Sequence, residues 1–193
     1  VKRNFEIAAR RMGVGRDSFA VVNYAHGYNV IRVEDCAAGR LPVADGISTA
    51  RRGITLVTLH ADCLPVYLLD PETPAAALLH AGWKGLYAHI VLKAVDFMRH
   101  AYGTRPASLL AAVGPSIGPC CFEVGEDVFS LLSREFGAET VRRETEKAYA
   151  DLWAACASDL MAAGVPAERV NLSRLCTACD AALFFSHRRD KGK

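Results

Sequence analysis

The apolar positions of this chain recur with two periods, which predict a mixture of helices and strands. Spacings of three and four residues predict helices over 1–12, 86–102, 125–136 and 152–163. Short β-branched or continuous apolar runs predict strands over 18–24, 28–33, 54–59, 65–69, 75–79, 108–113, 169–172 and 181–185. Because helices and strands are interspersed irregularly and hairpin-like turns are frequent, we expect an α+β domain rather than a regular βαβ array.

Three stretches lack this periodicity. Residues 35–53 are rich in Gly, Ala and Pro, which predicts a loop, and residues 138–149 are charged, which predicts an exposed segment. Residues 114–121 contain two glycines and two prolines. Such a loop could present backbone N–H groups to a substrate, but a rigid connector is the preferred interpretation.

Composition narrows the class of protein. The chain has 193 residues, of which 51% are hydrophobic and 23% charged, enough for one domain with a substantial core. A net charge of +2 argues against binding to nucleic acid or a membrane surface. No run reaches the roughly 18 apolar residues of a membrane span. The odd count of seven cysteines favours reduced thiols and a cytoplasmic location.

The candidate chemistry centres on Cys63 and His80, which lie at the ends of two neighbouring apolar segments. Such a scaffold can present a thiolate and an imidazole to one point. Catalytic zinc takes three protein ligands and leaves one position open for water. Spacing leaves His26, His60 and His89 open as the third ligand. A competing interpretation is metal-free nucleophilic catalysis, in which His80 activates the Cys63 thiolate.

A second cysteine pattern, Cys176-x-x-Cys179, suggests a redox or zinc motif when taken alone. A structural zinc site needs a second pair of ligands at similar spacing, and the sequence shows no such pair. The residues that follow are strand-like, whereas a thioredoxin-type motif opens a helix. We therefore expect these two cysteines to serve in packing.

Several short motifs occur in a fixed order over nearly the whole chain. They are AHG (25–27), ADG (44–46), ADCLPV (61–66), HAGWKG (80–85), GPSIG (114–118), DL (151–152), CT (176–177) and FFSHRRD (184–190). Together they resemble the YfiH family, also called the "polyphenol oxidase laccase" or purine nucleoside phosphorylase-like family. Two features depart from the family pattern. His187 replaces the usual Tyr, and the Ser-x-Arg-x-Gly-Gly segment expected upstream is absent.

The resemblance implies one domain over residues 1–193, without the family's N-terminal segment. This domain would be a mixed α/β sandwich distantly similar to cysteine hydrolases of the cytotoxic necrotising factor type. It also implies one zinc ion held by His26, Cys63 and His80. The implied activities are phosphorolysis of adenosine, inosine, guanosine or methylthioadenosine and deamination of adenosine, with purine nucleoside and phosphate as partners.

Three further residues are candidates for roles in this chemistry. Asp62 adjoins Cys63 and is the candidate for acid/base catalysis, although its carboxylate could instead orient a ligand. Phosphate needs cationic or N–H partners, for which Lys84, Arg188 and the 114–118 loop are candidates. For each of these three, scaffold or solvated charge is the preferred interpretation. No oligomeric state follows from the sequence.

Copper chemistry meets a counting objection. A four-copper centre needs roughly ten imidazoles, whereas the chain has six His. We therefore expect no laccase activity from such a centre, although the family label suggests a copper-dependent polyphenol oxidase. Two further alternatives are a metal-free Cys–His hydrolase or amidase acting on a cell-wall precursor, and a non-enzymatic binding module.

Overall fold

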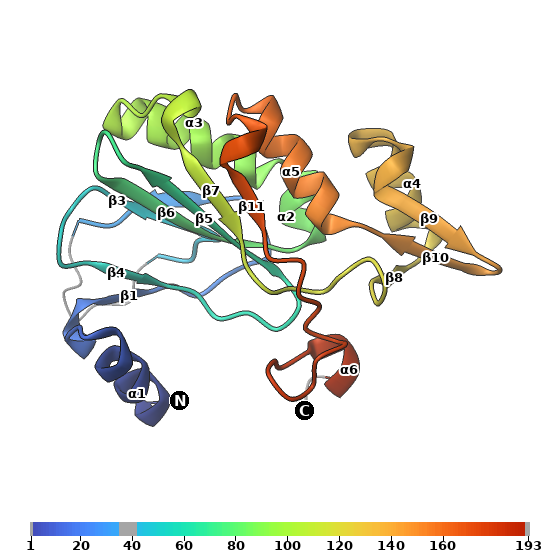
Figure 1. Ribbon diagram of the computed structural model, residues 1–193, viewed down its shortest axis with the longest axis horizontal. Helices are drawn as coiled ribbons and strands as arrows, with labels where there is room; N and C mark the ends of the chain where they lie inside the picture. Colours follow the sequence, from blue (N-terminus) through green and yellow to red (C-terminus); the bar gives the residue numbers. More distant parts are fainter. Residues whose placement is uncertain (1, 35–41, 192–193) are drawn as a thin grey trace.

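A six-stranded mixed sheet forms the centre of the protein, whose computed structural model describes residues 2–34 and 42–191 (Figure 1). In spatial order the strands are β11 (Val170–Leu172), β7 (Leu110–Val113), β5 (Leu64–Asp70), β6 (Ala75–Ala81), β3 (Gly46–Thr49) and β2 (Val30–Arg32). Strand β5 is antiparallel to both β6 and β7, and β6 is antiparallel to β3. The two outermost pairs, β11–β7 and β2–β3, are parallel.

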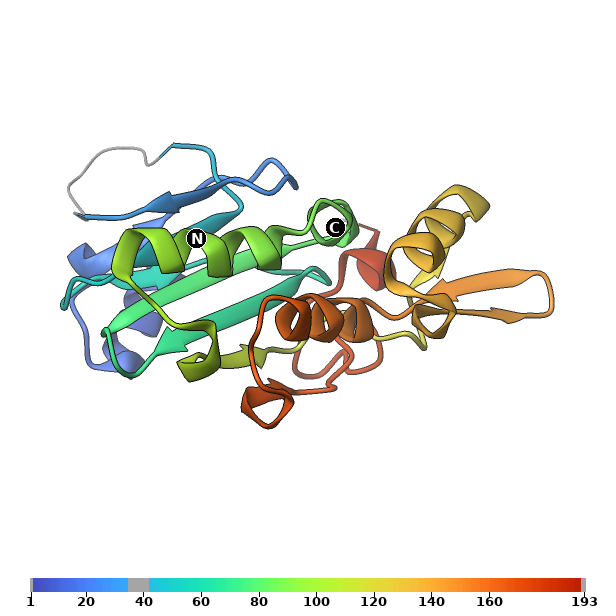
Figure 2. The same cartoon turned by 90° about the horizontal axis from the view of Figure 1, so that it is seen from above.

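Three helices cover one face of this sheet (Figures 1 and 2). They are α2 (Trp83–Tyr87), α3 (Ile90–Tyr102) and α5 (Leu152–Ala162). Helix α3 buries one apolar side, made of Ile90, Val91, Ala94, Val95 and Met98. This side joins the main core formed by the sheet, because apolar residues three and four apart share one side of a helix.

A thinner layer covers the opposite face. It consists of α1 (Lys2–Met12) and a two-stranded parallel sheet of β1 (Phe19–Val21) and β4 (Thr55–Val57) (Figure 1). A second, smaller core lies in this part of the fold and contains Ala20, Val22, Val33, Ile47 and Leu78. The sheet therefore buries both faces, which agrees with the expected α/β sandwich.

The remaining elements extend from one end of the sheet. Helix α4 (Glu126–Phe136) packs beside a three-stranded antiparallel sheet of β8 (Glu123–Val124), β10 (Lys147–Ala150) and β9 (Val141–Glu144). Short helix α6 (His187–Asp190) belongs to the C-terminal segment. Within the described ranges, no helix combines the length and apolarity that crossing a bilayer requires.

Most predicted elements are present, and the exceptions have physical reasons. The predicted loop 35–53 is wrong over Gly46–Thr49, which forms buried strand β3; its residues 35–41 lie outside the described ranges. These mostly small and polar residues show no apolar pattern in the sequence. They are nevertheless closely packed, because a Cβ at Gly46 would lie 2.8 Å from the Leu79 side chain. The predicted helix 86–102 is interrupted before Ile90, because His89 adopts a left-handed φ of 56°.

One further prediction is wrong. Residues 181–185 form a turn followed by irregular chain rather than a strand, and their apolar side chains Leu183 and Phe185 are 71% and 83% exposed. The charged stretch 138–149 is mostly exposed, as expected, and it takes part in the β9–β10 hairpin. Charged side chains can occupy the solvent face of such a hairpin, so their charge did not exclude strands.

Candidate metal centre

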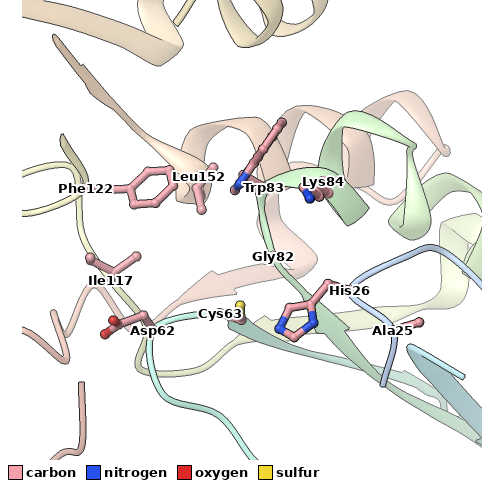
Figure 3. A pocket seen from close by; sticks show the side chains of 10 residues that line it. All are labelled: Ala25, His26, Asp62, Cys63, Gly82, Trp83, Lys84, Ile117, Phe122 and Leu152. Atoms are coloured by element: carbon pink, nitrogen blue, oxygen red, sulfur yellow. The ribbon is translucent and has the colours of Figure 1, made fainter. Parts of the chain in front are cut away.

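His26, Cys63 and His80 converge at one end of the central sheet. Their potential ligand atoms all lie within 4.8 Å of one another. Cys63 directly precedes β5 and His80 lies near the end of β6, where the antiparallel register pairs Pro65 with His80. His26 arrives from the connection between β1 and β2 with a φ of 56°. The two strands thus bring Cys63 and His80 together. An earlier turn adds His26, which Figure 3 shows beside Cys63.

The other two candidate ligands have different surroundings. The His60 ring lies 5.0 Å from that of His80, centroid to centroid. Its nitrogens contact Thr58 Oγ1 at 2.7 Å and the Cys63 carbonyl at 3.1 Å, so both are engaged. The ring nitrogens of His89 contact Asp159 and Glu135 instead. His26 is therefore the histidine whose position completes the cluster.

The structure also identifies two residues that sequence reasoning did not assign to the site. Asp45 is 1% exposed, and its carboxylate accepts a hydrogen bond from the Ala25 backbone at 3.1 Å. Its carbonyl accepts one from the His80 backbone at 2.7 Å. Tyr24 stacks on the His80 ring at a centroid distance of 4.1 Å. The Asp45 position in the ADG motif was the available signal, whereas nothing in the sequence indicated the Tyr24 stack.

Close backbone approach shapes the cluster. A Cβ at Gly82 would lie 3.1 Å from Cys63 Sγ and 3.9 Å from His26. A Cβ at Gly85 would lie 2.8 Å from the Gly27 carbonyl oxygen. The two glycines of the HAGWKG motif therefore admit the Cys63 thiol and the turn that carries His26.

The electrostatics of the cluster favour neutral side chains. Burial, together with the neighbouring His26, lowers the pKa of His80 to about 4. Burial and then His80 lower the pKa of His60 to about 4. Burial and then the carboxylates Asp62 and Asp45 raise the pKa of Cys63 to about 11. Neutral imidazoles suit metal ligation, and a cation beside Cys63 would stabilise its thiolate form.

The donor set fits a soft or borderline metal ion. The buried nitrogen His80 Nδ1 has no hydrogen-bond partner among the described residues. Buried polar atoms normally have a partner, so an orphaned nitrogen on an imidazole that lies beside a thiol and a second imidazole is consistent with ligation. One sulfur and two nitrogen donors match zinc in charge and softness.

A cavity of about 370 Å³ opens beside the cluster. Figure 3 shows Cys63 and His26 on one side of it, with Trp83 and Lys84 opposite. Its lining comprises Ala25, His26, Asp62, Cys63, Gly82, Trp83, Lys84, Ile117, Phe122 and Leu152. The Lys84 amine lies 5.7 Å from the Trp83 ring centroid. Among the described residues, no carboxylate forms an ion pair with Lys84, which leaves its charge available to a ligand.

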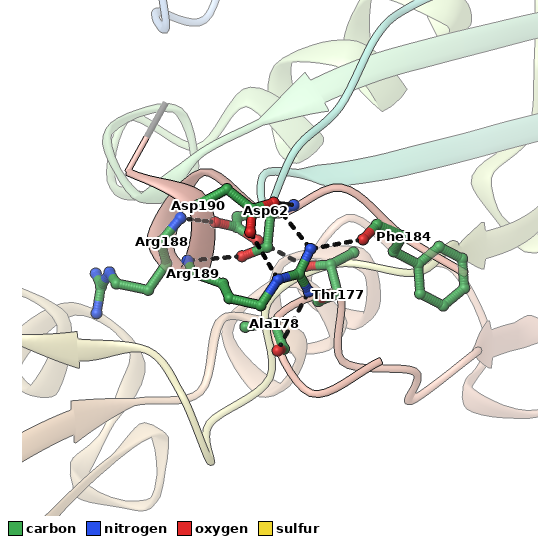
Figure 4. Close-up of polar contacts among 8 residues, drawn as sticks. Asp62, Thr177, Ala178, Phe184, Arg188, Arg189 and Asp190 are labelled. Atoms are coloured by element: carbon green, nitrogen blue, oxygen red, sulfur yellow. Dashed lines mark hydrogen bonds and ion pairs between the residues drawn. The ribbon is translucent and has the colours of Figure 1, made fainter. Parts of the chain in front are cut away.

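Asp62 lies at the cavity wall, but its carboxylate is engaged within the protein (Figure 4). Oδ1 accepts a hydrogen bond from Thr177 Oγ1 at 2.7 Å, and Oδ2 accepts one from the Arg188 backbone at 2.7 Å. Asp62 is 8% exposed and holds an unusual φ of 93°. These contacts fix the turn before Cys63 to the C-terminal segment, because Thr177 and Arg188 lie 115 and 126 residues after Asp62.

The other two phosphate-binding candidates are also engaged by the scaffold. The Arg188 guanidinium donates to the Cys121 and Glu123 carbonyls at 3.2 and 2.8 Å, and it is not among the cavity-lining residues. The N–H groups of the 114–118 loop donate to Pro65, Leu175 and Asp62 carbonyls and to a cysteine sulfur. The loop therefore acts as the rigid connector that the sequence favoured.

Comparisons with known proteins identify the family. A family model described as multi-copper polyphenol oxidoreductase laccase matches residues 1–193. The chain is 39% identical to purine nucleoside phosphorylase YlmD of Geobacillus stearothermophilus, over 80% of this chain and 58% of that protein. It is 33% identical to adenosine deaminase RL5 from an unknown prokaryotic organism, over 94% of this chain and 73% of that protein.

The fold agrees with these matches. The crystal structure of the hypothetical protein YfiH of Bacillus licheniformis superposes with a TM-score of 0.93 and 29% identity. The superposition covers 99% of this chain and 76% of the YfiH chain. This chain spans only 58% of the length of the Geobacillus relative. From the family match, the relatives and the shared fold together, the chain belongs to the multi-copper polyphenol oxidoreductase laccase family, to which the YfiH resemblance had pointed.

Proposed function

We propose that this chain carries the site of a zinc-dependent purine nucleoside enzyme. It would catalyse phosphorolysis of adenosine, inosine, guanosine or methylthioadenosine and deamination of adenosine. The observation that carries the proposal is the cluster of His26, Cys63 and His80, with ligand atoms within 4.8 Å, beside a cavity of about 370 Å³. Relatives named purine nucleoside phosphorylase and adenosine deaminase support the choice of reactions.

Zinc is the metal that this donor set suits best. Three protein ligands leave one coordination position open, which is the arrangement of catalytic zinc. Zinc bound there would supply Lewis acidity and could lower the pKa of a water molecule toward about 7. The proposal assigns a ligand role to His26, Cys63 and His80, and the unpaired His80 Nδ1 supports it.

The cavity has the size and the walls expected for a nucleoside. Its volume of about 370 Å³ lies within the range of roughly 300–1,000 Å³ typical of small-molecule sites. Trp83, Ile117, Phe122 and Leu152 provide an apolar wall. We propose that this wall receives the flat purine base and excludes water from it, because aromatic and aliphatic side chains favour such contacts.

Phosphate binding is assigned to Lys84. In phosphorolysis, a phosphate oxygen attacks C1′ of the ribose while the C1′–N9 bond breaks and its electron pair leaves with the base. Lys84 would hold the attacking phosphate by its charge and its N–H donors. Arg188 acts from behind this wall in the proposal, since its guanidinium holds the carbonyls on either side of the lining residue Phe122.

Asp62 receives a positioning role. Both of its carboxylate oxygens accept short hydrogen bonds from the C-terminal segment. A carboxylate held in this way fixes the turn that carries the neighbouring Cys63. The proposal therefore no longer relies on Asp62 to move a proton in the reaction.

The metal-free Cys–His hydrolase is the second candidate, and the electrostatics do not favour it. That mechanism needs a thiolate beside an imidazolium. Burial raises the pKa of Cys63 to about 11 and lowers that of His80 to about 4, so both shifts oppose such a pair. A cytoplasmic location remains part of the proposal, supported by the free thiols of the six described cysteines.

The experiment uses the zinc-loaded full-length protein with inosine and phosphate. We expect hypoxanthine release that depends on phosphate, and a loss of about tenfold or more in kcat/KM in Lys84→Met, because a charged contact to phosphate contributes at least about 1.4 kcal/mol. Lys147→Met is the matched control, since Lys147 pairs with Glu123 outside the cavity. Equal losses in the two variants would contradict the role of Lys84.

A further inference from the structure

Four cysteines from two distant segments meet beside the C-terminal segment. The potential ligand atoms of Cys120, Cys121, Cys176 and Cys179 all lie within 4.8 Å of one another. The Cys179 sulfur lies 3.4 Å from that of Cys121 and 3.6 Å from that of Cys120. The sequence has no second pair at the spacing of Cys176 and Cys179, but the fold supplies a pair of another kind. The adjacent Cys120 and Cys121 reach the other two because the chain folds back over more than fifty residues.

We propose that these four cysteines bind a second metal ion, a structural zinc, separate from the His26–Cys63–His80 centre. Zinc–sulfur bonds of about 2.3 Å place the sulfurs of a tetrahedral site about 3.8 Å apart. The two measured sulfur–sulfur distances of 3.4 and 3.6 Å are close to this spacing. Four thiolates select a soft or borderline ion and fill its coordination sphere, which is the arrangement of structural zinc.

The surroundings support thiolates at this position. The Gly118 backbone N–H donates to Cys176 Sγ at 3.2 Å. A backbone N–H donor of this kind stabilises a thiolate sulfur, which is the form of cysteine that binds zinc, and zinc binding would release the thiol protons.

Two cations flank the same loop from outside. The Arg142 guanidinium donates to the Pro119 carbonyl at 3.0 Å. The Arg188 guanidinium donates to the Cys121 carbonyl at 3.2 Å. A zinc ion with four thiolates carries a net charge of −2, which the Arg188 guanidinium would offset in part, whereas Arg142 also pairs with Glu144.

The position of the cluster gives it a structural task. Cys120 and Cys121 follow the loop that supplies Ile117 to the cavity, and Phe122 comes next. On the other side, Thr177 lies between the remaining two cysteines and holds the Asp62 carboxylate. An ion held by both segments would therefore fix one wall of the cavity to the turn before Cys63. Its removal would loosen that wall without touching the ligands of the first centre.

A disulfide is the competing use of these thiols, since Cys179 lies near both Cys120 and Cys121. Zinc content per chain distinguishes the two, measured after purification with a reductant and without chelator. We expect two zinc ions in the unchanged chain, one in the Cys120→Ser/Cys179→Ser double variant, and one in Cys63→Ser. The control Cys156→Ala should keep two, because Cys156 is fully buried elsewhere.

Two further measurements test for metal binding that is too weak to survive purification. Co²⁺ added to the metal-free chain should give thiolate charge-transfer absorption that survives Cys63→Ser and is lost when Cys120→Ser and Cys179→Ser are added to that variant. A chelator should lower the melting temperature of Cys63→Ser but leave that of the Cys63→Ser/Cys120→Ser/Cys179→Ser variant unchanged, because the latter has lost ligands of both centres. Cys63→Ser without zinc or cobalt absorption, a double variant that retains them in full, or a mass lower by the two hydrogens of a disulfide would each overturn the proposal. If only the four-cysteine site binds zinc, the unchanged chain and Cys63→Ser will both contain one zinc ion. That result would contradict only the proposed function.

Discussion

Replacing Thr177 by Val tests whether Asp62 is held by the C-terminal segment. Thr177 is 5% exposed, and its hydroxyl donates to Asp62 Oδ1 at 2.7 Å. Val keeps the branched shape and removes the donor, so a carboxylate oxygen is left buried without its partner. A hydrogen bond to a charged group contributes about 1.5–3 kcal/mol to stability, and leaving the acceptor unpaired costs a similar amount. We therefore expect the free energy of unfolding to fall by about 2–3 kcal/mol.

The assay is chemical and thermal unfolding of the chain. For a protein of this size, a loss of 1 kcal/mol lowers the melting temperature by roughly 2–4 °C, so we expect a decrease of roughly 4–12 °C. Thr177→Ser is the matched control, because it keeps the hydroxyl and should cost about 1 kcal/mol or less. Asp62→Gly tolerates the positive φ of position 62 and removes the acceptor, so a double-mutant cycle with Thr177→Val isolates the contact. A Thr177→Val cost no larger than that of Thr177→Ser, or a coupling energy near zero, would refute the reasoning.

Two other positions give independent tests. Replacing His89 by Asn keeps the left-handed backbone but removes the partner of Asp159, which is 3% exposed. The free energy of unfolding should therefore fall by about 1–3 kcal/mol. His100→Asn, at an exposed position, is the control and should change it little. Burial opposes the charge of His89, but the hydrogen bond and charge of Asp159 raise its pKa. The difference in unfolding free energy between the unchanged chain and His89→Asn should therefore be fully present below about pH 6.5 and fade as pH rises through the raised pKa. A difference that grows with pH would contradict this role of His89. Gly82→Ala places a Cβ 3.1 Å from Cys63 Sγ; competition with a chelator should show zinc affinity reduced about tenfold or more, and unchanged affinity would contradict the close fit.

The sequence was sufficient where local pattern and chemistry coincide. Two apolar runs placed Cys63 and His80 at neighbouring strand ends, and the β5–β6 register brings them together. The helix over 152–163 was also predictable, and the Asp151 carboxylate caps it by accepting from the Trp153 and Ala154 backbone N–H groups. In each case, the signal lay within a short stretch of chain.

Long-range packing decided what the sequence could not give. The choice of His26 over His60 depended on the family resemblance, because spacing does not show where a turn between two strands will lie. Strand β3 was missed because Gly46 and its polar neighbours are buried by pairing with β6 rather than by their own hydrophobicity. The four-cysteine cluster was missed for a related reason: its two pairs come from segments that meet only in the folded chain.

The most direct test of the central claim is phosphate-dependent release of hypoxanthine from inosine by the zinc-loaded full-length protein, measured beside its Cys63→Ser variant and with adenosine deamination followed in parallel. We expect base release that requires phosphate, and in Cys63→Ser the loss of this activity together with one zinc ion per chain. The absence of base release and of deamination for every purine nucleoside, or full activity in Cys63→Ser, would contradict the account.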